Sequence, residues 1–318
     1  MLSRLRERPS AATVRRLALA ALAANAGIVV SGGAVRLTGS GLGCPTWPRC
    51  TDASFVATPE MGLHGAIEFG NRLLTWVLVA VVVACVAATL RQRPRRTVLV
   101  RLSWALLAGV LAQALLGGVT VLTGLHPVTV MAHFLLSMVL VAVAVVLYER
   151  SGETDGPARS LVGRALRLGG RLLVGVTAAT LVLGTVVTGT GPHSGDVEVT
   201  DRLPIDPVTA VQLHADLVFL LLGLLVGLLL AMQASAAPSQ LRRRLLVLLG
   251  VVLGQGVVGY VQYLTDLPVV LVGVHLLGAC LVWIAALRVL LAMRERVGPG
   301  RAPGHASALP EPRTAATA

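Results

Sequence analysis

The apolar residues of this chain are gathered into long stretches that are separated by short polar segments. Eight stretches can be marked, each of about 20 residues and therefore long enough to cross a hydrocarbon core of roughly 30 Å as a helix. They cover residues 17–37, 66–90, 102–123, 128–148, 172–190, 208–232, 245–264 and 269–292. The pattern predicts an all-α integral membrane protein with eight transmembrane helices.

Composition and charge support this prediction and exclude other classes. The chain is 55% hydrophobic and only 13% charged, whereas soluble domains carry about 25% charged residues. Its net charge of +12 comes from 27 arginines and no lysine. All but four (Arg36, Arg49, Arg72 and Arg202) fall in segments on one side of the predicted membrane. The positive-inside rule makes that side cytoplasmic, so we expect a plasma membrane protein with both termini inside and no nucleic-acid partner.

An internal repeat divides the chain into two halves of four stretches each. Four residues of the first half recur in the second half 142 positions later. Gln113, Gly117, Leu125 and His133 correspond in that order to Gln255, Gly259, Leu267 and His275. Because each half starts inside, we expect two tandem four-helix bundles related by a parallel pseudo-twofold repeat. The predicted parts are a cytoplasmic N-terminal segment (1–16), an N-terminal bundle (17–148), a cytoplasmic linker (149–171), a C-terminal bundle (172–292) and a disordered cytoplasmic tail (293–318).

Two cysteines lie in the first outer loop of the predicted topology. Cys44 and Cys50 close the sequence Cys-Pro-Thr-Trp-Pro-Arg-Cys. A disulfide can persist outside the cytoplasm, and the two prolines bend the short loop between the cysteines. We expect a disulfide; the alternatives are two free thiols, or a metal site that lacks other ligands.

Two histidines lie at matching depth in the second half. His214 opens the sixth stretch and His275 opens the eighth, so both are near the outer face. Two neutral imidazoles facing each other across a four-helix bundle suit bis-histidine heme iron. The alternative is that each histidine makes an interhelical hydrogen bond.

The first half departs from this pair of histidines. His133 matches His275, but Asn71 stands at the position that corresponds to His214. His64 lies seven residues before Asn71 on the same helix face, about 10 Å nearer the outer surface. His126 likewise precedes His133 by seven residues, so an outer pair of His64 and His126 is an alternative ligand set.

Two charged residues accompany the missing histidine. Glu68 and Arg72 lie within the second stretch, and their counterparts in the second half are Val211 and Ala215. We interpret the second half as a fixed cofactor site and the first half as the site of reaction. The alternative is an i,i+4 ion pair that only anchors the entrance of the helix.

Four segments resemble the heme A synthase family, and the resemblance extends over roughly residues 17–292. They are Gly-Gly-Ala-Val-Arg-Leu-Thr at 32–38, Ser-Gly-Leu-Gly-Cys-Pro-Thr-Trp-Pro at 40–48, Ile-Glu-Phe-Gly-Asn-Arg at 67–72 and Gly-Pro-His-Ser-Gly-Asp at 191–196. The resemblance implies oxidation of the C8 methyl group of heme O to the formyl group of heme A, with heme b as the cofactor of the C-terminal half.

The resemblance also implies roles for individual residues. His214 and His275 would ligate the iron of heme b, and His133 would ligate the iron of the reacting heme. The spacing of the residues, apart from the resemblance, leaves His64 as a further candidate. Glu68 takes the place of the essential carboxylate of the family, and Cys44 and Cys50 take the place of its outer-loop disulfide. The chain departs from the family at Asn71, where most members have histidine, and lacks the cysteine pair that some bacterial members carry in the third outer loop.

The remaining expectations concern charged side chains and partners. Arg72 is expected to act with Glu68 in catalysis, and Arg36 and Arg72 are suited to pairing with heme propionates; Arg36 could instead extend to the membrane interface. The partners expected are the lipid bilayer, a heme O synthase that supplies the substrate, an unidentified electron donor or acceptor, and a second copy of the chain. The rival functions are a non-catalytic b-type cytochrome and a transporter.

Overall fold

The computed structural model describes residues 8–235 and 237–296, and this part of the chain contains eight long helices. They are α1 (Ala11–Leu37), α2 (Gly62–Arg91), α3 (Thr97–Leu122), α4 (Pro127–Ser151), α5 (Arg164–Thr190), α6 (Pro207–Gln233), α7 (Ser239–Leu264) and α8 (Val269–Leu291). Each helix is apolar and has 23 to 30 residues, which is enough to cross a bilayer at about 1.5 Å per residue. The prediction is confirmed: the chain is an all-α, multi-pass membrane protein.

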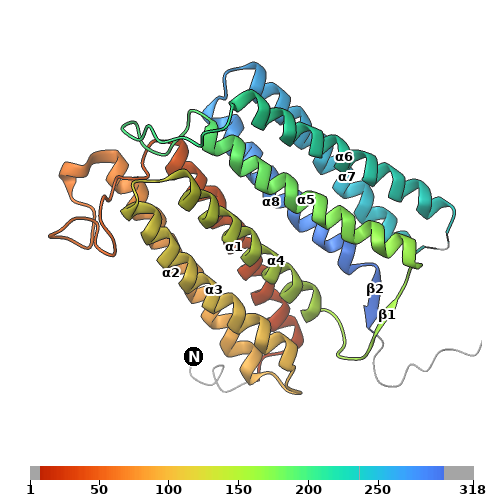
Figure 1. The fold of residues 1–318 in the computed structure, drawn as a ribbon. Helices are drawn as coiled ribbons and strands as arrows, with labels where there is room; N and C mark the ends of the chain where they lie inside the picture. The colour runs from red at the N-terminus through yellow and green to blue at the C-terminus, as the bar shows by residue number, and fades with distance from the viewer. Residues whose placement is uncertain (1–7, 236, 297–318) are drawn as a thin grey trace, which may run out of the picture.

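The helices form two bundles that lie side by side (Figure 1). In the first, α1 and α3 each pack against both α2 and α4; in the second, α5 and α7 each pack against both α6 and α8. The bundles meet where α8 packs against α1 and α4, and where α4 packs against α5. The order of neighbours is thus the same in the two halves, as the sequence repeat leads one to expect, although a pseudo-twofold relation between them remains a prediction.

Each bundle encloses its own apolar core, while large apolar side chains also cover its outer surface. Leu106 and Val141 are fully buried in the first bundle, and Leu225 and Leu245 in the second. Outward-facing residues such as Trp76, Leu115 and Leu230 are exposed. An apolar exterior of this kind suits helices that are surrounded by lipid.

A tight turn of the same form joins α3 to α4 and α7 to α8 at one end of the bundles, which is named the outer end after the predicted topology. Leu125 and Leu267 both adopt the left-handed conformation, with φ 58°. Their N–H groups donate to Thr120 and Gln262, at 2.9 and 2.8 Å respectively. Such a residue after a helix C-terminus satisfies free carbonyls and reverses the chain. The matching turns place His133 and His275 at the same depth, because each is the seventh residue of the helix that follows.

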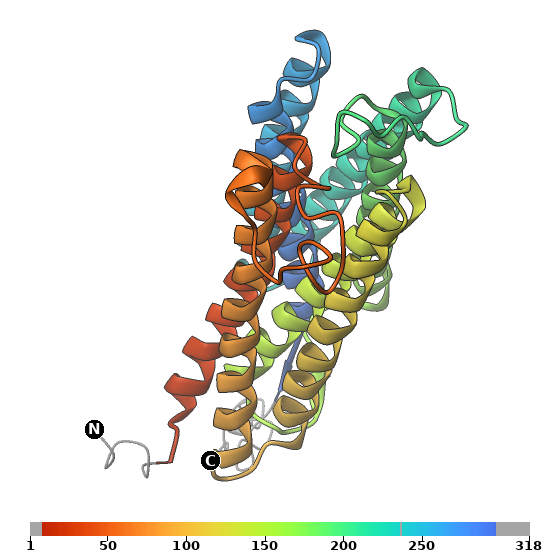
Figure 2. The same cartoon turned by 90° about the vertical axis from the view of Figure 1, so that its left-hand side faces the viewer.

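The two longer loops, 38–61 and 191–206, also lie at the outer end (Figures 1 and 2). The first ends in a short 3₁₀ helix, η1 (Pro59–Met61). The loops contact each other, since the N–H of Gly41 donates to the carbonyl of Gly195 at 2.8 Å. The outer ends of the two bundles are therefore joined by loop contacts as well as by helix packing.

At the opposite end, named the inner end after the predicted topology, the structure differs from the predicted domain boundaries. Strand β1 (Ala158–Ser160) pairs with strand β2 (Arg294–Arg296) in an antiparallel ladder, so residues 294–296 are ordered and do not belong to a disordered tail. The remainder of that predicted tail, 297–318, lies outside the described residues. Helices α1, α4 and α5 also extend beyond the predicted spans, into residues of the predicted N-terminal segment and linker. Arginine side chains allow this extension, because they can reach the aqueous interface from the end of a helix.

Ion pairs hold the inner end together. Asp155 accepts hydrogen bonds from Arg96, at 3.0 Å to each oxygen. These bonds, with the positive charge of Arg96 and Arg150, hold the pKa of Asp155 below its ordinary value. The stabilisation from this pairing is therefore present at neutral pH and is lost only as the pH falls through that lowered pKa.

Glu149 links the two bundles at the same end. Its carboxylate accepts from Arg288 of α8 at 2.6 Å and from Arg244 of α7 at 3.3 Å, and its side chain is largely buried. The indole N–H of Trp283 makes a second link, because it donates to the carbonyl of Met138 on α4 at 2.9 Å.

We expect Glu149→Gln to lower the free energy of unfolding by about 1–3 kcal/mol, because a charged hydrogen bond is lost and two arginines keep no counter-charge. The measurement is the Tm of the purified protein in detergent. Glu295→Gln makes the same change at an exposed position and serves as control. Equal Tm shifts in the two variants would contradict a linking role for Glu149.

Candidate functional site

His214 and His275 face each other inside the C-terminal bundle. Their ring centroids are 6.5 Å apart and their planes are inclined at 63°. The Nδ1 atom of His214 lies 3.1 Å from the carbonyl of Thr180, and so donates to it if it carries the proton. His275 Nδ1 is buried and has no partner in the described part of the chain.

This geometry fits a metal ion held between two imidazoles. An ion bound at about 2 Å by one nitrogen of each ring separates the centroids by roughly 6 Å. The hydrogen bond of His214 to a carbonyl orients the ring and leaves Nε2 free, as is usual for a histidine ligand. Among the described residues no group of three or more His, Cys, Asp and Glu side chains forms a metal site. A pair of facing imidazoles is a donor set that would fit heme iron, whereas zinc takes three or four protein ligands.

Each of the two imidazole rings packs against a glycine, which has no Cβ atom to crowd the ring. A Cβ atom added at Gly259 would lie 3.3 Å from Cε1 of His275, and one at Gly184 would lie 3.2 Å from Cε1 of His214. The amide of Gln255 fixes the backbone beside the ring, because it donates to the carbonyl of His275 at 2.5 Å. The glycine and glutamine positions of the sequence repeat are thus explained by contact with the histidine.

His133 has the same surroundings in the N-terminal bundle. The amide of Gln113 donates to the carbonyl of His133 at 2.7 Å, and a Cβ atom at Gly117 would lie 3.0 Å from its Cε1. Its Nδ1 is buried and unpartnered among the described residues. His133 therefore has the local environment of His275, including an orphaned ring nitrogen.

Asn71 differs from His214 in its contacts as well as in its chemistry. Its Oδ1 accepts a hydrogen bond from the hydroxyl of Ser31 on α1 at 2.7 Å. An amide oxygen is a poor ligand for iron beside an imidazole, and this oxygen already has a partner. The first half therefore presents one imidazole at this level where the second half presents two.

The two outer histidines of the first half make loop contacts. His64 is exposed near the start of α2, and its Nδ1 lies 2.9 Å from the hydroxyl of Ser40. His126 is exposed and caps the N-terminus of α4, where it accepts from the N–H of Val128 at 3.4 Å. Both histidines therefore lie at the surface of the outer end, where they make loop and helix-capping contacts.

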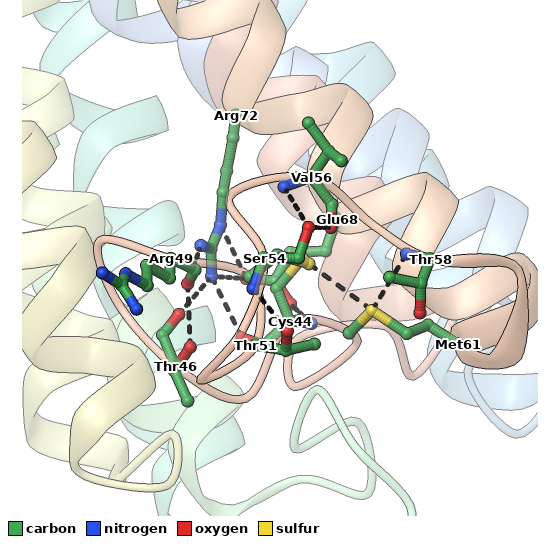
Figure 3. Close-up of a disulfide and its surroundings, with 11 residues drawn as sticks. Cys44, Thr46, Arg49, Thr51, Ser54, Val56, Thr58, Met61, Glu68 and Arg72 are labelled. Carbon is green, nitrogen blue, oxygen red and sulfur yellow. Dashed lines mark hydrogen bonds and ion pairs between the residues drawn. A yellow bond between two sulfur atoms is a disulfide. The ribbon is translucent and has the colours of Figure 1, made fainter.

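The disulfide between Cys44 and Cys50 is confirmed, and it lies directly beside Glu68 (Figure 3). The N–H of Cys44 donates to Oε2 of Glu68 at 2.5 Å, and Arg72 donates to Oε1 at 2.6 Å. The Glu68 carboxylate is buried and lies between the loop and its own helix. Both of its oxygens are therefore fixed.

Arg72 ties the disulfide loop to α2. Its guanidinium donates to the carbonyls of Cys44, Thr46 and Arg49 at 3.0–3.1 Å, in addition to Glu68 (Figure 3). These bonds occupy its donors, so they favour the anchoring role over the predicted pairing with a propionate. We interpret Arg72 as a positioning residue for Glu68 and the loop.

Trp47 was missed as a site residue by sequence reasoning. Its indole ring packs against Gly118 on α3, where an added Cβ atom would overlap it. The loop that contacts Glu68 is thus fixed to α3 through Trp47 and to α2 through Arg72. Two sequence features could have indicated this contact: the tryptophan between the two prolines of the loop, and the adjacent glycines at 117 and 118.

Helix capping fixes the entrance of α6, which carries His214. Asp206 accepts from the N–H and the hydroxyl of Thr209, at 2.8 Å each. These hydrogen bonds, that from the backbone N–H foremost, hold the pKa of Asp206 below its ordinary value. Pro207 follows at the first helical position, where its missing N–H costs nothing.

Comparison with known proteins points to one family. Residues 15–193, more than half of the chain, match COX15-CtaA, described as cytochrome oxidase assembly protein. The chain is 32% identical over 157 residues to a protein named heme A synthase from Listeria monocytogenes, which is 48% of this chain and 50% of the relative. It is 30% identical over 107 residues to a protein of the same name from Geobacillus kaustophilus, which is 33% of this chain and 32% of that relative. The match thus spans at most about half the length of these relatives.

Proposed function

Because the chain belongs to the COX15-CtaA family of cytochrome oxidase assembly proteins, we propose that it is a heme A synthase, which oxidises the C8 methyl group of heme O to the formyl group of heme A. The observation that carries the proposal is the difference between its two halves. One half has two facing histidines; the other has a single equivalent histidine, His133, and a buried carboxylate, Glu68, that the outer loop and Arg72 fix in place.

In this proposal the C-terminal half holds heme b through His214 and His275. When bound, heme b supplies the one-electron chemistry that no side chain of the bundle can supply. The protein positions it: Thr180 orients His214, Gln255 fixes the backbone of His275, and Gly184 and Gly259 leave room for the rings.

The N-terminal half holds the substrate, heme O, through His133. One strong axial bond suits a substrate, since the substrate must enter and the product must leave. Glu68 is the proposed catalytic residue, which would take up the protons that the methyl group loses as it becomes an alcohol and then an aldehyde, or would stabilise positive charge beside the ring. Arg72 and the N–H of Cys44 keep its carboxylate in place. The formyl oxygen would come from water with an electron acceptor as the oxidant, or from O2 with an electron donor.

The proposal extends to topology and partners. The arginine-rich inner end with β1 and β2 faces the cytoplasm of the plasma membrane, and the disulfide loop faces outward, where the bond persists. A heme O synthase supplies the substrate, a separate electron donor or acceptor completes the reaction, and the chain associates as a homo-oligomer.

The proposal is tested by heme extraction after co-expression with a heme O synthase in a host that lacks heme A. We expect heme A in cells with the wild-type chain, and heme O alone without it. The purified protein should also contain heme b. Heme b with no heme O or heme A would favour a b-type cytochrome, and a heme-free protein that transports a solute would overturn the proposal.

We expect His133→Ala to reduce heme A formation much more than His64→Ala does. His133 is the half-buried ring with a free nitrogen, whereas His64 is exposed and contacts Ser40. The measurement is the ratio of heme A to heme O at equal protein level. If His64→Ala abolished activity while His133→Ala were tolerated, the substrate iron would lie at the level of the outer loops.

A further inference from the structure

A cavity of about 370 Å³ lies at the outer end between the two bundles. It is bordered by the end of α1, the loop 192–202 and the start of α8. The side chains that matter are Arg36 from the first half, and His193, Asp196, Arg202 and Val269 from the second. The reaction proposed above leaves this cavity without a role.

The cavity carries positive charge that the described residues do not neutralise. Arg36 donates through Nη2 to the carbonyl of Thr188 at 2.8 Å, but its Nε is buried and has no partner among the residues described. Neither Arg36 nor Arg202 belongs to an ion pair in that part of the chain, and their charges repel each other. A guanidinium with a free, buried donor is suited to an anionic acceptor.

Neutral acceptors hold Arg202 in place and leave its charge uncompensated. Its donors go to the carbonyls of Gly191, Pro192, Val199 and Asp201. The carboxylate that borders the cavity, Asp196, accepts from the N–H of Glu198 at 2.9 Å. The side chains that border the cavity therefore carry two positive charges, those of Arg36 and Arg202, against the single carboxylate of Asp196.

The cavity also lies at the outer edge of the two-histidine site. Val269 begins α8, and His275 follows six residues later, about 9 Å further along the helix axis. Helix α1 packs closely on this part of α8: a Cβ atom at Gly273 would lie 3.7 Å from Cδ1 of Leu37, and one at Gly33 would overlap Leu276. His193 fixes the loop to the start of α8 through its contact with the carbonyl of Leu267 at 3.1 Å.

We propose that this cavity binds a propionate carboxylate of the heme that His214 and His275 hold, with Arg36 as its principal donor. A guanidinium matches a carboxylate in shape and charge. The inference rests on the proposed function only in placing heme b in the C-terminal half. Since Arg36 belongs to the N-terminal half, the first bundle supplies the counter-charge for the cofactor of the second.

The test measures the rate at which heme leaves the purified protein for an excess of apomyoglobin. Wild type, Arg36→Gln and Arg36→Lys are each loaded with heme b or with its dimethyl ester, whose propionates carry no charge. Arg49→Gln is the control, because Arg49 is an exposed arginine of the outer loops. Absorption spectra establish that each sample holds six-coordinate heme before the measurement.

We expect Arg36→Gln to release heme b about tenfold faster than wild type, with Arg36→Lys in between and Arg49→Gln unchanged. With the dimethyl ester, wild type and Arg36→Gln should release heme at the same rate. A redox titration gives a second readout: loss of a positive charge beside the propionate should shift the ferrous-to-ferric ratio about tenfold, which is 59 mV for a one-electron couple.

Two outcomes would overturn the inference and differ in their bearing on the proposed function. If wild type and Arg36→Gln hold heme b with the same release rate and potential, the propionate lies elsewhere, while the function stands. If in addition an anionic phospholipid co-purifies with wild type and not with Arg36→Gln, the cavity is a lipid phosphate site. If no variant, wild type included, binds heme b, both the inference and the proposed cofactor fail.

Discussion

Purified His275→Ala is expected to lack the low-spin absorption spectrum of bis-histidine heme, and His214→Ala is expected to behave in the same way. The two rings lie 6.5 Å apart by their centroids and face each other across one bundle, so either substitution leaves a single axial ligand. Loss of the ligand also opens a void beside Gly259 or Gly184, which lowers the stability of the bundle. We expect near-complete loss of heme b and a lower Tm.

The control for this prediction is His126→Ala. His126 is also a histidine at the outer end of a helix, but it is exposed and caps α4. Its removal should leave the heme spectrum of the C-terminal half unchanged. A low-spin bis-histidine spectrum that persists in both His214→Ala and His275→Ala would exclude this pair as the ligands.

Glu68→Ala should stop the formation of heme A while heme b stays bound. General acid–base groups typically contribute 10²–10⁴-fold to a rate, so we expect a loss in that range. The substitution also leaves the buried N–H of Cys44 without an acceptor, at a cost of about 1–3 kcal/mol. The measurement is the heme A content of cells that co-express a heme O synthase, together with the spectrum of the purified variant.

Glu68→Gln removes the negative charge of the side chain but keeps its size and position. Glutamine keeps an oxygen that can accept from Cys44 or Arg72 but carries no negative charge, so we expect a folded loop and an activity as low as that of Glu68→Ala. Glu60→Ala, at an exposed acidic position in η1, is the matched control and should be fully active. Heme A formation at the wild-type rate in Glu68→Ala would show that the carboxylate is only structural.

Much of the fold was predictable because hydropathy alone determines which segments can cross a bilayer. The ends of the helices were less predictable: α5 begins at Arg164, eight residues before the apolar stretch, since arginine is a good helix former and can extend to the interface. Strand β2 was missed because its pairing with β1 joins segments more than 130 residues apart, and neither segment carries a strand pattern of its own.

The candidate site was predictable where the repeat applied. The pairing of His214 with His275 followed from matching depth, and the disulfide followed from the loop sequence. The contact of Glu68 with Cys44 was not predictable, because its donor is a backbone N–H that depends on how the loop folds. The hydrogen bond from Ser31 to Asn71 joins helices 40 residues apart in sequence and has no local signal either.

The links made by Glu149 and Trp283 have a consequence for biosynthesis. Glu149 is translated 95 residues before Arg244 and 139 before Arg288, and Met138 precedes Trp283 by 145 residues. At about 5–20 residues per second, a ribosome needs roughly 7–28 s to reach the last of these partners. During that time α4 is inserted with an unpaired carboxylate at its inner end and an uncovered face toward lipid. Helix α8, the last of the eight spans in the described residues, thus completes the first bundle as well as the second, and a chain truncated before it should be degraded as an unassembled protein.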